Sequence, residues 1–120
     1  MARAALAFID AFLAGDDGAL SATCTERFSF DGDTRTGKAE VRRAWRDLLS
    51  GRDPAQKQRL LDLEILPAAD ALARLGPPPA RIAALAATRG TWIAIANVSR
   101  RPVVLFLSKE AGRWAVAGIE

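Results

Sequence analysis

The sequence predicts a single α+β domain in which helices pack against an antiparallel sheet. The last part of the chain, 91–119, holds three short apolar runs separated by two polar breaks that are typical of turns. The runs are 92–98, 103–107 and 114–119. Their length and spacing indicate a three-stranded antiparallel meander. Upstream, apolar residues recur at helical period, so we expect helices that cover this sheet.

The bulk composition fits one ordinary globular domain. The chain has 120 residues, of which 50% are hydrophobic and 26% are charged, and this is enough apolar material for one core. The longest aliphatic or aromatic run, 103–107, is far shorter than the roughly 20 residues of a membrane helix. The N-terminus lacks a signal-peptide pattern, and a lone Cys24 excludes an internal disulfide. We therefore expect a cytoplasmic protein with no membrane association.

Charge and missing residue types exclude several functions. The net charge is +3, with 14 arginines and 3 lysines, but acidic residues interrupt the basic ones and no basic-aromatic stripe occurs. We expect no nucleic-acid partner. The chain contains no histidine and no tyrosine, so histidine-dependent triads and imidazole acid–base catalysis are excluded. With one cysteine and no histidine, a structural zinc site is excluded too, and we expect no metal and no cofactor.

The first half of the chain predicts three helices and one strand. The expected helices are 2–14, about 18–23, and 38–50, and the expected strand is 27–31. Gly15 ends the first helix, and Asp16 or Asp17 caps the second, because a carboxylate accepts hydrogen bonds from the free amides of the first turn. Cys24 is expected in the core, since no basic neighbour in sequence lowers its pKa. A polar loop is expected between Asp53 and Gln58.

The second half begins with a strand and two helices. The strand is expected over 60–66, where apolar residues alternate with acidic ones, and the helices over 68–75 and 81–88. Leu72 and Leu75 are expected on one side of the first of these helices, and Ile82 and Leu85 anchor the second. Three prolines at 77–79 separate the two helices and are expected to form a stiff, extended spacer.

Both faces of the predicted meander are apolar. Ile93 and Ile95 lie on one face, whereas Trp92 and Ala94 lie on the other, and the next strand shows the same arrangement. A sheet covered by one helical layer needs only one apolar face. We therefore expect a homodimer through the outer sheet face, although small alanines on an open face are the alternative.

Several of these features together resemble one superfamily. They are two N-terminal helices joined at Ala14-Gly15-Asp16, a short strand, Thr36-Gly37-Lys38 opening a helix that contains Val41 and Trp45, and the end Gly112-Arg113-Trp114-Ala115-Val116. The chain resembles the nuclear transport factor 2-like (NTF2-like) superfamily, which includes SnoaL-like polyketide cyclases and steroid delta-isomerases. The resemblance implies a cone, in which a curved, mixed or antiparallel sheet wraps around the N-terminal helices and leaves a pocket inside.

Two departures from the family pattern stand out. The helical and proline-containing insertion at about 68–90 replaces a plain connection between strands, and it forms a lid, a dimer arm or a substitute layer. The isomerase-type members use a tyrosine on the first helix, where this chain has Phe8 and Phe12. The resemblance places the general-base carboxylate near Asp31, for which the alternative is a turn aspartate bonded to nearby amides.

Four further residues are candidates for ligand binding. Asn97 lies within an apolar strand and either lines the pocket or faces solvent, and Asp10 lies either at the mouth of the cone or outside it. Trp45 and Trp92 form either a pocket wall or part of the core. Asp31 and Asp33 are too few oxygen ligands for a hard cation.

The leading hypothesis is a domain that binds a small apolar ligand in the cone or acts as a dimeric interaction module, without catalysis. The alternative is a SnoaL-like or ketosteroid-isomerase-like enzyme with Asp31 as general base. A third hypothesis is a structural domain whose exposed sheet face docks another protein.

Overall fold

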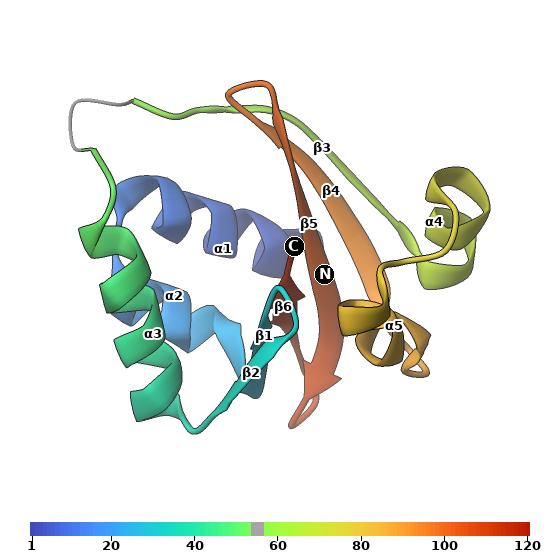
Figure 1. The fold of residues 1–120 in the computed structure, drawn as a ribbon, viewed down its shortest axis with the longest axis horizontal. Helices are drawn as coiled ribbons and strands as arrows, with labels where there is room; N and C mark the ends of the chain where they lie inside the picture. The colour runs from blue at the N-terminus through green and yellow to red at the C-terminus, as the bar shows by residue number, and fades with distance from the viewer. Residues whose placement is uncertain (54–56) are drawn as a thin grey trace.

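The computed structural model describes residues 1–53 and 57–120, and it contains helices on both sides of one sheet (Figure 1). The helices are α1 (Ala2–Ala14), α2 (Asp17–Thr23), α3 (Lys38–Ser50), α4 (Ala68–Leu75) and α5 (Ala80–Ala87). The strands are β1 (Cys24–Phe30), β2 (Asp33–Thr36), β3 (Leu60–Pro67), β4 (Trp92–Val98), β5 (Arg101–Glu110) and β6 (Arg113–Ile119). The polar loop predicted between Asp53 and Gln58 includes residues 54–56, and to that extent it lies outside the described residues.

The six strands form one mixed, open sheet in the order β2-β1-β6-β5-β4-β3. Strands β4, β5 and β6 are the predicted antiparallel meander, and Ile93 pairs with Phe106 at its centre. Strand β1 runs parallel to β6, with Phe30 opposite Ile119, so the N-terminal half joins the sheet beside the last strand. The predicted α+β architecture with N-terminal helices against a mixed sheet is therefore confirmed.

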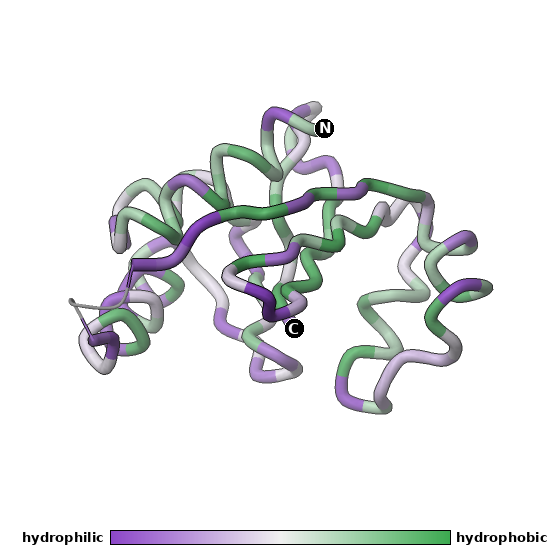
Figure 2. Tube along the Cα trace, turned by 90° about the horizontal axis from the view of Figure 1, so that it is seen from above, coloured by the Kyte–Doolittle hydropathy of each residue, from purple (hydrophilic) through white to green (hydrophobic). Residues whose placement is uncertain are grey.

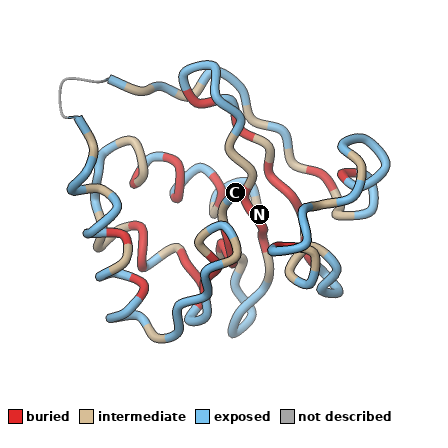
Figure 3. Tube along the Cα trace, viewed as in Figure 1, coloured by how far each residue is buried: buried red, intermediate tan, exposed pale blue. Residues whose placement is uncertain are grey.

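Helices α1, α2 and α3 cover one face of the sheet, which we call the inner face. Its side chains on the meander include Ala94, Ala96, Leu105 and Leu107, all of them fully buried. Four aromatic side chains fill the space between this face and the helices: Phe8, Phe28, Phe30 and Trp45. The buried residues in Figure 3 follow the strands and the sheet-facing sides of these helices. The main core thus occupies the interior of the cone.

Local sequence signals place the helix ends of the first half. Gly15 adopts a left-handed conformation and ends α1, and the Asp16 carboxylate accepts a hydrogen bond from the Ala19 amide at 3.0 Å, which caps α2 as predicted. Lys38 fixes the start of α3, because its Nζ donates to the carbonyl oxygens of Ser21 (2.9 Å) and Cys24 (2.6 Å). These contacts tie α3 to the end of α2.

Helices α4 and α5 lie on the opposite, outer face of the sheet. In Figure 2 this segment stands on the side of the sheet away from the N-terminal helices. Ile82 of α5 is 3% exposed and packs with Ile93 and Phe106, whose side chains alternate with those of the inner face. The insertion at 68–90 is therefore a layer of the same chain on the outer face. A single chain does not test the expected homodimer, but α4 and α5 occupy part of the face proposed for it.

Some details of the structure differ from the prediction. Strand β2 was missed, because its four residues are all exposed and carry no apolar pattern. Helix α5 begins one residue earlier than expected and ends at Ala87, before the predicted stop at Gly90. Leu72 and Leu75, which share one side of α4 as expected, are 52% and 60% exposed, whereas Ala71 of the same helix is buried. None of the described helices is both long and apolar enough to span a membrane.

Cys24 is a core residue with a consequence for stability at high pH. Burial raises the pKa of its thiol from 9.0 to about 12, and the nearby Trp45 side chain offsets this only in part. Above pH 9 the unfolded chain loses the thiol proton, whereas the folded chain keeps it. The stabilising contribution is therefore complete below pH 9 and is lost as the pH rises toward 12.

Replacement of Cys24 by Ala tests this linkage. We expect the wild-type free energy of unfolding to fall by about 1.4 kcal/mol more than that of Cys24→Ala between pH 8 and pH 10. Urea unfolding of both proteins at each pH measures the difference, and the titration of lysines cancels because it is common to both. Equal pH dependence of the two proteins would contradict a protonated, buried thiol.

Candidate ligand groove

A groove of about 860 Å³ lies between the α4–α5 segment and the outer face of the sheet. We call it the outer groove. Its walls are α4, the proline spacer 77–79 and α5, and its floor is formed by the beginning of β4 and the middle of β5. The groove closes at the loop 88–91, where the Ala68 amide donates a hydrogen bond to the Thr91 carbonyl oxygen at 3.3 Å. The segment that connects β3 to β4 therefore crosses over the outer face of the sheet.

The floor and the walls of the outer groove are mainly apolar. Ile93 and Phe106 form the buried floor, with Val104 beside them. Leu72 and Leu75 project from α4 into the lining with more than half of their surface exposed. Large apolar side chains gathered around a concavity are unusual on a protein surface and are typical of binding sites.

Helix α5 packs closely on the sheet where Leu85 approaches Gly118 of β6. A Cβ atom at this position would lie 2.5 Å from Cδ2 of Leu85 and 3.2 Å from the carbonyl oxygen of Ser29. Any larger residue would therefore force Leu85 to shift from its position above β6. Together with buried Ile82, this contact sets the distance between α5 and the sheet, and hence the width of the groove.

Arg81 fixes the N-terminal end of α5. Its Nε donates to Asp31 Oδ1 at 2.9 Å, and its Nη2 lies 3.6 Å from Oε1 of Glu120. Gly32 allows this approach, because a Cβ atom there would lie 2.9 Å from the Cβ of Arg81. The turn after β1 and the end of the chain thus hold α5 by an ion-pair cluster at the surface.

This cluster also places Asp31, the residue predicted as general base. Asp31 occupies the turn between β1 and β2 with φ 52°, and its side chain is 56% exposed. Its carboxylate contacts Arg81 and faces away from the aromatic interior of the cone, to which Phe30, the preceding residue, belongs. Asp33 pairs with Arg35 at 3.0 Å, so the two aspartates bind separate arginines. Across 1–53 and 57–120, no three metal-ligating side chains gather at one place.

The structure separates the four predicted ligand-binding residues. Trp45 lies in the main core at 2% exposure, and Asp10 is exposed on α1. Trp92 is found at the end of the outer groove, although strand alternation places its side chain against the main core. Asn97 is exposed and lines a smaller hollow of about 280 Å³ beside the ion pair of Arg74 and Glu64.

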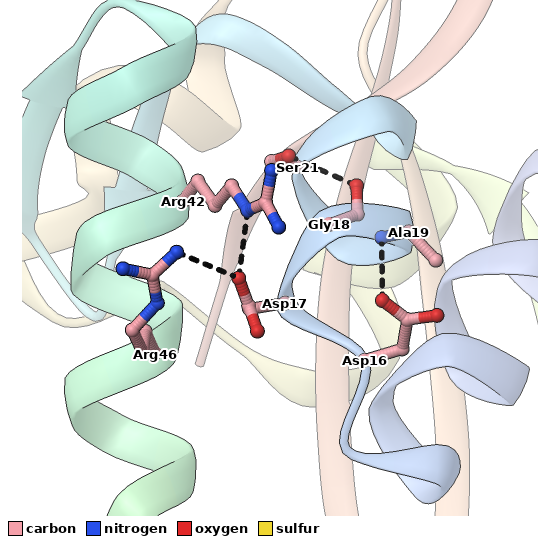
Figure 4. Close-up of polar contacts among 7 residues, drawn as sticks. All are labelled: Asp16, Asp17, Gly18, Ala19, Ser21, Arg42 and Arg46. Carbon is pink, nitrogen blue, oxygen red and sulfur yellow. Dashed lines mark hydrogen bonds and ion pairs between the residues drawn. The ribbon is translucent and has the colours of Figure 1, made fainter.

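A second polar cluster joins α2 to α3 (Figure 4). The Asp17 carboxylate accepts a hydrogen bond from Arg42 Nε at 2.8 Å and lies 3.6 Å from Arg46 Nη2. The hydrogen bond from Arg42 lowers the pKa of Asp17 below its usual value. Both arginines are exposed on α3, and their shared carboxylate gives them a structural role between two helices.

The sequence reasoning missed the outer groove itself. Its lining residues are mostly alanine, proline and leucine, which carry no catalytic or metal-binding pattern. Two signals pointed to it nevertheless. Both faces of the meander are apolar, and the amphipathic helices of 68–88 lie between two of the strands. These signals indicate a second layer on the outer face, and the structure shows that the insertion supplies part of it.

Comparison with known proteins gives a fold but no sequence relative. No family model matches the sequence, and no curated protein matches it. Solved structures do match over nearly the whole chain. A putative dehydratase of the NTF2-like family from Streptomyces avermitilis is 14% identical, with a TM-score of 0.54, covering 98% of this chain and 88% of that one. The chain has the NTF2-like fold.

Two further structures support the NTF2-like fold. A putative calcium/calmodulin-dependent protein kinase type II association domain from Thiobacillus denitrificans is 16% identical, with a TM-score of 0.56, over 98% of this chain and 89% of that one. Aln2 from a Streptomyces species is 15% identical, with a TM-score of 0.55, over 98% of this chain and 83% of that one. The resemblance inferred from the sequence is confirmed at the level of the fold. The varied names of these neighbours mean that the NTF2-like fold alone does not identify an activity.

Proposed function

We propose that this NTF2-like chain binds a small, mainly apolar molecule in the outer groove. The observation that carries the proposal is the groove itself, a concavity of about 860 Å³ with a buried apolar floor and two exposed leucines in its wall. Volumes of roughly 300–1,000 Å³ with mainly hydrophobic linings are typical of small-molecule sites. A bound apolar molecule would remove Leu72 and Leu75 from water, and this burial supplies the driving force.

The interior of the cone is a less suitable place for such a ligand. Trp45 packs against Phe8 with ring centroids 5.6 Å apart and against Phe30 at 4.9 Å. Phe28 lies 5.7 Å from the same indole. These side chains fill the space between α1, α3 and the sheet, so a ligand there would have to displace the core. The outer groove needs no such rearrangement.

The enzymatic alternative with Asp31 as general base has weaker support in the geometry. A general base needs to reach its substrate in a site from which water is largely excluded. Asp31 lies on the surface and is held by Arg81, next to Glu120. Binding without catalysis therefore remains the proposed function. The homodimer stays a prediction, which light scattering of the purified protein checks.

A pair of leucine variants tests binding in the outer groove. Leu72 on α4 and Leu48 on α3 are 52% and 58% exposed, but only Leu72 lines the groove. We expect the neutral fluorescent dye Nile red to bind the wild-type protein. We expect Leu72→Gln to weaken this binding by roughly tenfold, since about 1.4 kcal/mol of apolar burial is lost.

Leu48→Gln is the matched control, and we expect it to leave the dye affinity unchanged. Fluorescence titration gives the three dissociation constants, and circular dichroism shows whether each variant is folded. The proposal is wrong if the dye does not bind, or if both variants weaken it equally.

A further inference from the structure

Most polar groups of the outer groove gather at one end of it. The loop 88–91 contributes Thr88, Arg89 and Thr91, whereas the rest of the wall and floor is almost entirely apolar. Thr91, directly before β4, is 6% exposed and lines the groove. Its hydroxyl makes no hydrogen bond with any residue of 1–53 or 57–120. A hydroxyl in this position is available to a ligand.

Arg89 is an exposed residue of the same loop, and its charge is uncompensated. Within the described part of the chain, no carboxylate pairs with its guanidinium, which carries five N–H donors. The end of α5 does not require it either. The Thr88 amide donates to the Leu85 carbonyl oxygen at 3.2 Å, and the Thr88 hydroxyl donates to that of Ala84 at 2.9 Å. Thr88 thus satisfies two carbonyl oxygens of the last turn of α5, and the Arg89 guanidinium makes no hydrogen bond with residues 1–53 or 57–120.

The other charged residue of the lining, Glu120, belongs to the opposite end of α5. Its carboxylate pairs with Arg81, near the start of the helix, while Arg89 follows the last turn. Eight residues of α-helix span about 12 Å, so the two charges lie well apart along the groove. The groove therefore has a basic, hydrogen-bonding end and an acidic end, with apolar surface between them.

We propose that the outer groove selects apolar molecules that carry a single carboxylate. The carboxylate pairs with Arg89 and accepts a hydrogen bond from the Thr91 hydroxyl, and the apolar body lies under α4 and α5 against Ile93 and Phe106. Guanidinium groups suit carboxylates because parallel N–H donors match the two oxygens. This inference rests on the proposed function and adds the chemical class and the orientation of the ligand.

Three molecules of equal chain length test the selection: decanoate, decanol and decylamine. Each displaces Nile red from the wild-type protein in a competition titration. We expect decanoate to bind about tenfold more tightly than decanol, as one solvent-accessible, charge-assisted contact allows. We expect decylamine to bind most weakly. Added salt lowers the affinity for decanoate but not for decanol, because it screens an exposed ion pair.

Two arginine variants locate the contact. We expect Arg89→Gln to reduce the affinity for decanoate to that for decanol and to leave decanol unchanged. Arg100→Gln, at an exposed arginine of the β4–β5 turn that is not part of the outer groove, is the control and changes neither. Arg89→Lys is expected to restore part of the preference, since it keeps the charge but loses the paired donors.

The possible failures are distinguishable. Equal binding of decanoate and decanol, or equal effects of Arg89→Gln and Arg100→Gln, would overturn the carboxylate selection while the groove proposal stands. Tightest binding of decylamine would place the head group at Glu120 and would overturn the inferred orientation. If neither Nile red nor any of the three molecules binds, both proposals fail.

Discussion

Trp45→Ala is expected to lower the free energy of unfolding by about 3–5 kcal/mol, the usual cost of removing a large buried aromatic side chain. Trp45 is 2% exposed and makes ring contacts with Phe8, Phe12, Phe28 and Phe30 at centroid distances of 4.9–6.2 Å. The variant leaves a cavity at the centre of this cluster, and rings from α1 and β1 lose their common neighbour. Few other single changes would disturb three elements at once.

Urea unfolding followed by circular dichroism measures the effect. Trp45→Phe is expected to cost clearly less, because it keeps an aromatic ring in place and leaves a smaller cavity. Leu48→Ala, at an exposed position of the same helix, controls for helix propensity and is expected to change stability by less than about 1 kcal/mol. If Trp45→Ala costs no more than Leu48→Ala, the cone interior is not the well-packed core described above.

The fold was largely predictable because its signals are local. The spacing of Val41, Trp45 and Leu49 specifies a helix at 38–50, and glycines at its ends mark both limits. Alternating apolar residues with two turn breaks specify the meander in the same way. Strand β2 has no such pattern, since it joins the sheet by pairing with β1 while all its side chains remain exposed. Its existence depends on a partner strand and not on its own composition.

The candidate site was not predictable to the same degree, because it depends on how distant segments meet. The sequence shows that α4 and α5 are amphipathic but not which surface they cover. Trp45 had two interpretations, pocket wall or core, and only its packing distinguishes them. Asp31 matched a family position, yet its partner Arg81 comes from the insertion, fifty residues later. Arg89 and Thr91 belong to no sequence motif. They became candidate ligand-binding residues only because the structure places them at the end of the groove.

Gly118→Val is expected to be the second most disruptive change, with a loss of about 1–3 kcal/mol in stability and at least tenfold in Nile red affinity. Gly118 is buried in β6 beneath α5, where a Cβ atom would also lie 3.3 Å from Cδ2 of Phe106. Phe106 forms the floor of the groove and Leu85 holds α5, so the added side chain pushes the wall and the floor apart. We therefore expect Gly118→Val to lose dye binding even though the variant remains folded.

The double variant Leu85→Ala/Gly118→Val separates this local displacement from general destabilisation. Shortening Leu85 removes the closest contact, at 2.5 Å, so the two substitutions are expected to be less harmful together than the sum of their separate costs. Unfolding and dye titration of the four proteins complete the cycle. Strict additivity would mean that Leu85 does not rest on Gly118. The expected result is a non-additive free energy of unfolding together with loss of dye binding in Gly118→Val. This result would show that the contact between Gly118 and Leu85 sets the shape of the groove, because a substitution on β6 would then act on the groove through α5.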